Sequence, residues 1–409
     1  MNIIVAPDSF KGSLTALEAA DAIEQGIRHV LPEAEIVKFP LADGGEGTCE
    51  AMVLASEGRF VKEKVTGPLG EPVEATYGIL GDDITGVIEM AQAAGLGLAP
   101  PDKRNPLITT TYGVGELMKA ALSAGCTRLI VGLGGSATND GGAGMAQALG
   151  ARLLNEDRQE LPRGGAALLD LAQVNVSKLD PRLENATVYA ATDVTNLLIG
   201  PQGASAVYGP QKGATPEMVA TLDRALNHYA EIIQRHLGVE LRETSGMGAA
   251  GGLAAGLVAF CGAQVRSGAS LVLQMLRFEE YLGSVDIIFT GEGRLDRQIE
   301  FGKAISGVAL LAEKHQIPVV AFTGRLDIEP DKLAARGVRG VVPIVPGPMS
   351  EQEAMTGASD LLQAAAERTM RLLLLGRDLA QARWRDPDAL HTPRGKADAR
   401  GPALSEGKG

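Results

Sequence analysis

The chain is poor in cysteine, and its few cysteines suggest no pairing. Cys49, Cys126 and Cys261 are far apart and form no CxxC motif. That spacing argues against a disulfide framework and against a metal site built on cysteines. A reducing compartment suits such a chain, so we expect a cytoplasmic protein.

Positive charge is also scarce, because 38 lysines and arginines face 50 aspartates and glutamates, for a formal net charge of -12. A chain without a basic surplus has little to hold a phosphate backbone with, so nucleic acid is not expected as a partner. An acidic enzyme that handles anions must concentrate its few useful cations locally. Single lysines and arginines inside glycine-rich stretches are therefore the candidates for anion binding.

Long apolar runs and several well-known motifs are missing as well. No stretch reaches the ~18 consecutive apolar residues of a membrane span, and residues 1–10 lack the basic start of a signal peptide. No membrane association is expected. The sequence has no GxxxxGK followed by Ser or Thr, no protein-kinase signature and no HExxH among its five histidines. These absences exclude a P-loop enzyme, a protein kinase and a zincin-type metal site.

Glycine, by contrast, is abundant, with 52 residues, while aromatic residues make up only 4%. Such a chain contains many tight turns and close backbone approaches, which suits loops that wrap phosphates. Its length of 409 residues and its hydrophobic content of 45% fit two domains of ordinary size. We expect these two domains to share a cleft.

Both ends of the chain carry the strand and helix patterns of an α/β domain. Residues 2–6 predict a buried strand, 14–30 a helix and 35–39 a second strand. Near the other end, strands are predicted at 285–290, 317–323 and 341–345, and helices at 303–314, 330–336 and 351–375. Together these segments predict one discontinuous α/β domain with a five-stranded parallel sheet, flavodoxin-like or Rossmann-like, with helices on both faces.

The middle of the chain has a different pattern, which predicts an inserted second α/β domain. A hairpin is expected over residues 61–79, and strands over 128–132 and 187–191. The predicted division is residues 1–64 plus 285–376 for the first domain and residues 65–284 for the insert. Residues 377–409 are polar and contain several prolines and glycines, which predicts a disordered tail. A peptide that docks on a partner is the alternative.

The loop after the first predicted strand lies where parallel α/β sheets bind their ligands. In this loop, Lys11 can hold a phosphate or a carboxylate beside Ser9 and Ser13. Ser13 or Thr15 can instead serve only as the cap of the following helix. The position favours a functional role for Lys11.

The loop after the second predicted strand, residues 41–48, is placed in the same way. Its glycines Gly44 and Gly45 can expose backbone N–H groups to an anion. Asp43 or Glu46 can bind a Mg²⁺ that bridges phosphates. A tight turn capped by the aspartate is the structural alternative.

A third glycine-rich loop, residues 132–144, leaves a predicted strand of the insert. The backbone at Gly134 and Gly135 can cradle phosphates, and Ser136 and Asn139 can add hydrogen-bond donors. Asp140 is a possible metal ligand. So many glycines would be costly if they only connected two elements.

Two further segments of the insert carry candidate residues. Asp193 follows a predicted strand, and it can accept the proton of an attacking hydroxyl or bind a metal. Asn196 in the same segment is a candidate for substrate binding. Lys212 lies in a turn before a helix capped at Thr215, and it is a candidate for anion binding, although turn chemistry alone explains that segment.

Residues 291–298 are the last candidate loop, between a predicted strand and a predicted helix. Arg294 can clamp a substrate carboxylate, Asp296 can orient a hydroxyl or a metal, and Gln298 belongs to the same set. An Arg–Asp pair can also be purely structural. The GxGxxG at residues 246–251 is a weak dinucleotide fingerprint, because no clear strand precedes it, and it predicts close packing of a helix instead.

These motifs occur in a characteristic order. The series is APDSFKGSLTA (6–16), LADGGEGT (41–48), GLGGSATNDGGAG (132–144), ATDVTN (191–196), GPQKGAT (209–215), GAAGGL (248–253) and GEGRLD (291–296). It resembles the bacterial type I glycerate kinase family over about residues 1 to 376. Each motif is weak alone, but the ordered set is specific.

The resemblance implies transfer of a phosphoryl group from Mg-ATP to D-glycerate, at the 2-hydroxyl to give 2-phosphoglycerate and ADP. It implies Lys11 and Arg294 on anionic groups, Asp193 as base or hydroxyl orienter, and Asp43 and Asp296 near metal or substrate. The partners implied are small molecules, and we expect a monomer or a homodimer.

Two positions depart from the pattern of that family. Leu197 and Ile299 stand where the family usually has Pro and Thr, respectively. Phosphorylation of the 3-hydroxyl stays open as an alternative. The rival hypotheses are an NAD(P)-dependent oxidoreductase, suggested by the GxGxxG, and a non-catalytic sugar-acid sensor with a kinase-like fold.

Overall fold

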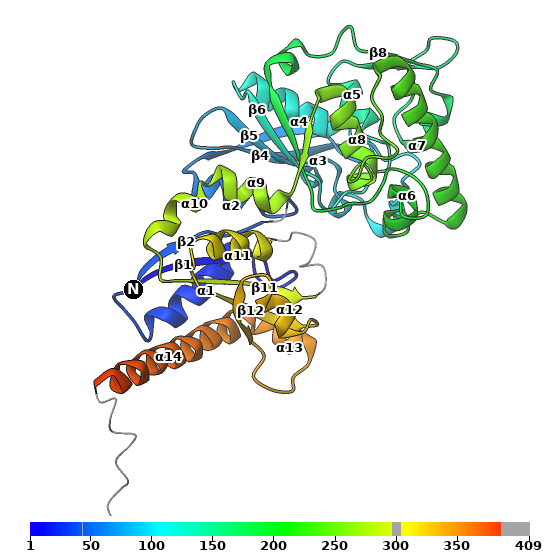
Figure 1. The fold of residues 1–409 in the computed structure, drawn as a ribbon. Coiled ribbons are helices and arrows are strands. Elements are labelled where there is room, and N and C mark those ends of the chain that lie inside the picture. The colour runs from blue at the N-terminus through cyan, green and yellow to red at the C-terminus, as the bar shows by residue number, and fades with distance from the viewer. Residues whose placement is uncertain (43, 297–303, 386–409) are drawn as a thin grey trace, which may run out of the picture.

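The computed structural model describes residues 1–42, 44–296 and 304–385, which form two sheets with layers of helices between and outside them (Figure 1). The first sheet is five-stranded, and every neighbouring pair in it is parallel. Its strands, in order across the sheet, are β13 (Val338–Pro343), β12 (Val319–Leu326), β11 (Ile287–Leu295), β1 (Asn2–Pro7) and β2 (Glu35–Lys38). Numbered along the chain this order is 2-1-3-4-5, so the flavodoxin-like prediction is confirmed.

The second sheet has six strands, with β10 to β5 parallel and the β3–β4 hairpin antiparallel. In order, the strands are β10 (Gln264–Arg266), β9 (Thr187–Ala191), β6 (Arg128–Gly132), β5 (Thr85–Glu89), β4 (Pro72–Ile79) and β3 (Arg59–Thr66). The predicted hairpin and both predicted strands of the middle segment are therefore present. Because β3 begins at Arg59, the first strand of this sheet starts a few residues before the domain boundary that was expected at residue 65. A separate small ribbon pairs β7 (Arg152–Leu154) with β8 (Gln173–Asn175).

Helices α1 (Ala16–Arg28) and α14 (Ala358–Arg385) cover the outer face of the first sheet (Figure 1). Thr15 caps α1 in a capping box with Glu18, and the apolar residues of α1 recur at helical spacing on its buried face. Gly26 lets the two helices approach closely, because a Cβ there would lie 2.2 Å from the Gln363 carbonyl oxygen.

A shared apolar layer separates the two sheets. It contains α2 (Thr48–Ala55), α9 (Gly268–Met275), α10 (Phe278–Tyr281) and α11 (Ala304–Lys314). Ile4 and Ile288 of the first sheet belong to the same buried cluster as Val87 and Ile130 of the second. The two sheets are therefore held together by one core, which fixes their facing edges relative to each other.

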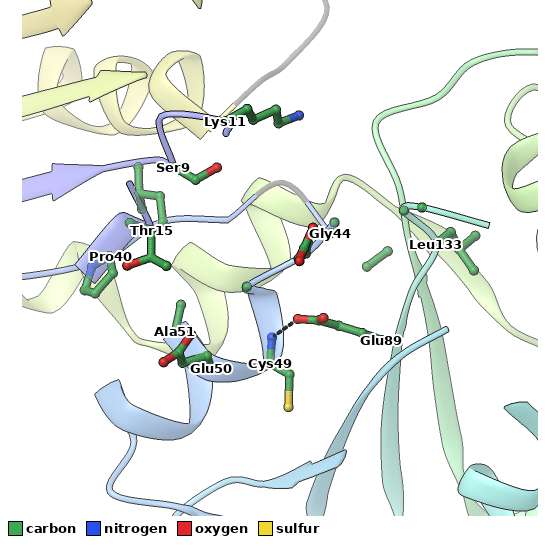
Figure 2. A pocket seen from close by; sticks show the side chains of 18 of the residues that line it. Ser9, Lys11, Thr15, Pro40, Gly44, Cys49, Glu50, Ala51, Glu89 and Leu133 are labelled. Atoms are coloured by element: carbon green, nitrogen blue, oxygen red, sulfur yellow. Dashed lines mark hydrogen bonds between the residues drawn. The ribbon is translucent and has the colours of Figure 1, made fainter. Parts of the chain in front are cut away.

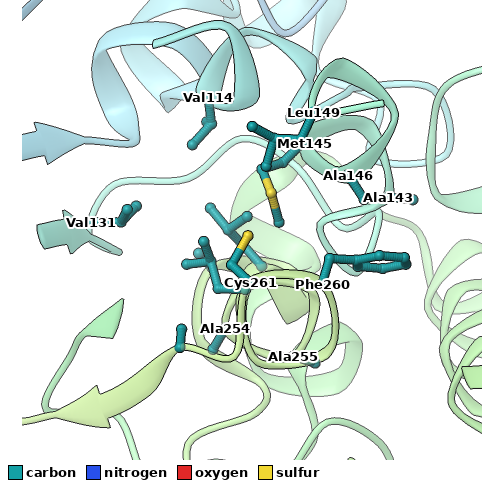
Figure 3. Close-up of a cluster of buried hydrophobic side chains, with 14 of the residues drawn as sticks. Val114, Val131, Ala143, Met145, Ala146, Leu149, Ala254, Ala255, Phe260 and Cys261 are labelled. Carbon is teal, nitrogen blue, oxygen red and sulfur yellow. The ribbon is translucent and has the colours of Figure 1, made fainter. Parts of the chain in front are cut away.

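The other face of the second sheet is covered by helices that contribute most of a second buried cluster. They are α3 (Ala91–Ala94), α4 (Tyr112–Ser123), α5 (Ala143–Ala148), α6 (Ala204–Tyr208), α7 (Pro216–Leu237) and α8 (Ala249–Cys261). Figure 3 shows Met145 of α5, and Leu149 directly after that helix, in one cluster with Phe260 and Cys261 of α8. All three cysteines of the chain are buried free thiols, as expected.

The C-terminal part differs from the prediction in two ways. The expected helix over 351–375 is two helices, α13 (Glu351–Thr356) and α14, which are separated at Gly357. Helix α14 then continues to Arg385, so residues 377–385 of the expected tail are helical, while residues 386–409 lie outside the described part.

The remaining helical elements are short. Helix α12 spans Pro330–Ala334, and the 3₁₀ turns are η1 (Leu96–Leu98), η2 (Pro101–Lys103), η3 (Gly165–Asp170), η4 (Pro181–Asn185), η5 (Pro210–Lys212) and η6 (Leu282–Ser284). Across the described residues, no helix has the length and apolar character needed to span a bilayer.

Candidate active site

A cavity of about 1390 Å³ lies where the carboxyl ends of parallel strands from both sheets meet. Its walls come from the segments at or after the ends of β1, β2, β5, β6 and β9, and part of it is shown in Figure 2. Ligands of open α/β sheets bind at this edge. The residues predicted from the sequence that line it are Ser9, Lys11, Ser13, Gly44, Gly45, Glu46, Gly134, Gly135, Asp193 and Asn196.

The loop after β1 brings Ser9 and Lys11 to one wall of the cavity (Figure 2). The buried carboxylate of Asp8 accepts a hydrogen bond from the Ser9 backbone N–H at 2.6 Å. The Ser13 hydroxyl donates to the Phe10 carbonyl at 2.8 Å, so it holds the turn. Since Thr15 is the cap of α1, the structure assigns the capping role to Thr15 and leaves Ser13 on the cavity wall.

The loop after β2 packs its backbone directly on the second sheet. Gly44 has φ +88°, and a Cβ there would lie 2.8 Å from the Ala191 carbonyl oxygen at the end of β9. A Cβ on Gly134 would lie 2.6 Å from the Gly45 Cα. The glycines at this contact are therefore needed for close approach as well as for the left-handed backbone. Glu46 lines the cavity and is exposed, whereas Asp43 lies outside the described residues.

The segment after β9 adds Asp193 and Asn196 to the lining of the cavity. The Asn196 side chain is oriented from both ends, because its Nδ2 donates to the Gln202 carbonyl and its Oδ1 accepts from the Tyr208 hydroxyl, each at 2.8 Å. Tyr208 also lines the cavity. Sequence reasoning missed Tyr208, since nothing in its local pattern distinguishes it from a core tyrosine.

Glu89 is a second cavity residue that sequence reasoning missed. It is the last residue of β5, and its side chain reaches the start of α2 (Figure 2). Burial raises the pKa of the Glu89 carboxyl, and backbone hydrogen bonds from Cys49 and Gly47 oppose that shift. The sequence did contain a signal for Glu89, because it ends the apolar run TGVIE at residues 85–89. That run was not predicted as a strand, so the signal was not used.

The polar side chains of the third glycine-rich loop do not line the cavity. Lys212 is 1% exposed, and its Nζ donates to the Ser136 Oγ and to the Thr138 carbonyl, both at 2.7 Å. Asn139 is fully buried and donates to the Ser205 hydroxyl at 2.9 Å. The expectation of ligand contacts for Lys212, Ser136 and Asn139 is therefore corrected. A buried lysine must be hydrogen-bonded, and here it supports the loop from behind.

Asp140 is likewise a structural residue of this loop. Its buried carboxylate accepts from the Thr111 backbone N–H at 2.8 Å and from the Gly142 N–H at 3.1 Å. These bonds tie the loop to the start of α4. The candidate role as a metal ligand does not fit a carboxylate that is fully buried outside the cavity.

Residues 291–295 are a strand rather than a loop, because β11 continues to pair with β12 through Leu295. Arg294 lies opposite Arg325 in that ladder, and its Nε is 2.7 Å from the Asp327 Oδ2. Arg294 and Asp296 do not line the cavity, and the Arg294 side chain is 57% exposed. The predicted contacts of Gln298, and the departure at Ile299, lie outside the described residues.

The glycines of the GxGxxG segment pack on the third loop, as predicted. A Cβ on Gly251 would lie 2.0 Å from the Thr138 carbonyl oxygen, and one on Gly252 would lie 2.9 Å from the Gly141 Cα. The left-handed conformation of Gly251 and Gly252 starts the helical part of α8. These glycines serve backbone packing and form no dinucleotide cradle.

The Glycerate kinase family matches residues 3–374. The chain belongs to the glycerate kinase family. It is 50% identical over 366 residues to a glycerate kinase of Bacillus subtilis, covering 90% of this chain and 96% of the relative. It is 46% identical over 376 residues to the glycerate 2-kinase of Escherichia coli, covering 92% and 99%.

A solved structure agrees with this assignment. The structure of a putative glycerate kinase 2 from Salmonella typhimurium LT2 matches with a TM-score of 0.83 and 48% identity, covering 93% of this chain and all of that chain. Membership of the glycerate kinase family makes the chain an enzyme, a phosphotransferase. The rival hypotheses of an oxidoreductase and of a non-catalytic sensor are thereby set aside.

The donor set of this glycerate kinase site bears on the expected Mg²⁺. In the part of the chain that the structure describes, no three His, Cys, Asp or Glu side chains gather as a metal cage. Mg²⁺ in phosphoryl transfer is usually held by one or two carboxylates together with substrate phosphates and waters. Glu46 lines the cavity and is exposed, so its carboxylate fits that mode of binding.

The buried lysine of this glycerate kinase predicts a pH-dependent stability. Burial lowers the pKa of Lys212 from 10.5 to about 7. Between these values the unfolded chain binds more protons than the native one, so native stability conferred at this site rises with pH. Compared with the Lys212→Met variant, the wild type should gain up to about 1.4 kcal/mol in its free energy of unfolding for each pH unit across that window. Urea unfolding of both proteins from pH 7 to pH 10 measures the difference, and parallel curves would refute the shifted pKa.

Proposed function

We propose that this enzyme transfers the γ-phosphoryl group of ATP to the 2-hydroxyl of D-glycerate, giving 2-phosphoglycerate and ADP. One observation carries the proposal: a single cavity is lined by a lysine, by glycine-rich backbone and by an aspartate that follows a strand. Phosphoryl transfer needs positioning, positive charge near the phosphates and a carboxylate for the hydroxyl proton. The names of the Bacillus and Escherichia relatives support glycerate as the acceptor.

In the proposed reaction, the glycerate hydroxyl oxygen forms a bond to the γ-phosphorus. The bond from that phosphorus to the oxygen shared with the β-phosphate breaks, and ADP leaves. Asp193 accepts the hydroxyl proton, and Lys11 binds the anionic groups of the substrates. A bound Mg²⁺, held by Glu46 and the phosphates, would neutralise phosphate charge. Asp43 stays a candidate ligand from the sequence.

The choice of the 2-hydroxyl follows the Escherichia relative, which is named a glycerate 2-kinase. Incubation of the enzyme with D-glycerate and Mg-ATP, followed by phosphorus NMR of the product, tests both parts of the proposal. The spectrum of 2-phosphoglycerate is the expected result. A product phosphorylated at the 3-hydroxyl would refute the position, and absence of ADP formation would refute the substrate pair.

One end of the same cavity has an apolar lining that suits the nucleoside of ATP. Leu54 and Phe60 line it, and each is 47% exposed, close to the polar side chains of Lys62, Thr76 and Gln92 on the same wall. An aromatic face beside hydrogen-bonding side chains suits a purine base, and base–aromatic stacking is worth about 1–3 kcal/mol. The proposal therefore puts the adenine at this end of the cavity.

Replacing the aromatic side chain should weaken nucleotide binding selectively. For Phe60→Ala we expect KM for ATP to rise about tenfold, with KM for D-glycerate unchanged. Phe60→Tyr keeps the stacking face and serves as the matched control. Initial rates at varied ATP and varied glycerate measure the two constants. A rise in KM for glycerate alone would show that the acid, and not the adenine, occupies this end.

The cytoplasmic location, the division into two domains and the monomeric or dimeric state stay predictions from the sequence. Size-exclusion chromatography with light scattering measures the last of these directly.

A further inference from the structure

Glu89 links the six-stranded sheet to helix α2 beside the cavity. It is the last residue of β5 in the six-stranded sheet, and it is 6% exposed. Its Oε1 accepts a hydrogen bond from the Cys49 backbone N–H at 2.8 Å, as the dashed line in Figure 2 shows. Cys49 lies in the first turn of α2, directly after the loop that follows β2 of the other sheet.

The contact supplies what the sequence of α2 lacks. The first backbone N–H groups of a helix have no partner inside the helix, and a side chain at the N-cap position normally satisfies one of them. In α2 that position is Gly47, which makes no side-chain cap. The Glu89 carboxylate, at the end of strand β5, accepts the hydrogen bond that an N-cap side chain would normally accept. A negative charge is also favourable at the start of a helix.

The place of the capped helix gives this contact a function. Gly44 and Gly45 precede α2 on the cavity wall, and they pack against Ala191 and Gly134 of the second sheet. Backbone contacts hold this loop at its glycines, and the Glu89 carboxylate holds it at the helix start. The two contacts together restrain the position of the loop relative to Asp193. Preorganised geometry of this kind is what phosphoryl transfer requires of the protein.

We propose that Glu89 is a positioning residue for phosphoryl transfer, which holds the Gly44–Gly47 loop at the cavity by capping α2 from the end of strand β5. The role of the loop in catalysis rests on the proposed function above, whereas the capping itself does not. Neighbouring carboxylates face the same helix start: Glu46 and Glu50 both disfavour further negative charge there.

Three substitutions separate this role from a direct chemical one. Glu89→Gln keeps an oxygen that can accept from the Cys49 N–H but removes the charge. Glu89→Asp keeps the charge but draws the carboxylate back by one methylene, and Glu89→Ala removes both. If Glu89 positions the loop, Gln should retain kcat within about threefold, while Asp and Ala should lose kcat by up to about 10²-fold. Glu33→Ala, on an exposed loop away from the cavity, is the surface control.

Amide hydrogen exchange gives a readout that does not depend on the substrate. The amides at the start of α2 should exchange faster in the Asp and Ala variants and remain protected in the Gln variant. Retained kcat in Asp together with lost kcat in Gln would overturn the proposal, since charge would then be the required property. Unchanged exchange in Ala would overturn it as well. If D-glycerate is not phosphorylated by the wild type, the exchange result still decides the capping role.

Discussion

Asp193→Asn should lower kcat by about 10² to 10⁴-fold while leaving the fold intact. The segment after β9 brings Asp193 to the cavity that Lys11 and Ser9 of the loop after β1 also line. In the proposed reaction it takes the proton of the glycerate hydroxyl, which an amide cannot do. The isosteric change keeps the volume of the side chain, so KM for ATP should change much less than kcat. A coupled assay of ADP release measures both constants.

The control for Asp193→Asn is the same chemical change at a distance from the cavity. Asp157 lies in the exposed turn between β7 and β8, and Asp157→Asn should be as active as the wild type. Equal thermal unfolding of the two variants would show that loss of activity is not loss of structure. Near wild-type kcat for Asp193→Asn would remove this residue from the role of base. The proton would then have to pass to another group of the cavity.

How far the sequence predicted this site depends on the kind of signal each residue carries. Apolar runs such as residues 2–6 and 128–132 predicted strands correctly, and the rule that parallel strands bind ligands at their carboxyl ends placed Lys11, Gly44 and Asp193 on one cavity. These residues were found because each follows a recognisable strand. The ordered motifs supplied the family independently.

Residues whose role depends on tertiary contacts were misjudged. The turn around Lys212 predicts an anion-binding lysine, but the fold buries it against Ser136 and Thr138. Local sequence does not reveal such burial. Glu89 was missed for a related reason, because its partner Cys49 is 40 residues away in the sequence and no short-range pattern connects the two.

Two errors concerned the ends of elements, where local signals compete with pairing. The glycines at 291 and 293 suggested a loop, yet pairing with β12 extends β11 through Leu295. The start of α13, by contrast, has a clear signal in the sequence, because Ser350 and Glu353 form a capping box there. The break at Gly357 that divides α13 from α14 was not predicted.

Gly44→Ala should damage both stability and activity, because two independent costs coincide at this residue. An alanine at φ +88° is strained by about 1–2 kcal/mol. Its Cβ would also lie 2.8 Å from the Ala191 carbonyl oxygen, and relief of such overpacking costs about 1–3 kcal/mol more. Relief requires the loop to move away from the second sheet, so kcat/KM should fall by about 10²-fold. Urea unfolding and steady-state kinetics measure the two effects.

Gly70 offers a matched control for the strain alone. It has φ +93° in the turn between β3 and β4, and a Cβ there would meet nothing within 4 Å. Gly70→Ala should therefore lose only about 1–2 kcal/mol of stability and keep its kcat/KM. Equal stability and activity of the two variants would show that the Gly44 loop yields without consequence.

The second glycine of the same contact decides whether the loop moves as one unit. Gly134→Ala has no positive φ to strain, but its Cβ would lie 2.6 Å from the Gly45 Cα. If either substitution displaces the loop from the six-stranded sheet, the displacement also clears space for the other. The double variant should then lose less stability than the sum of the two single losses, as expected for residues in contact. Additive losses would mean that each clash is relieved separately, and the loop would not be a rigid part of the site.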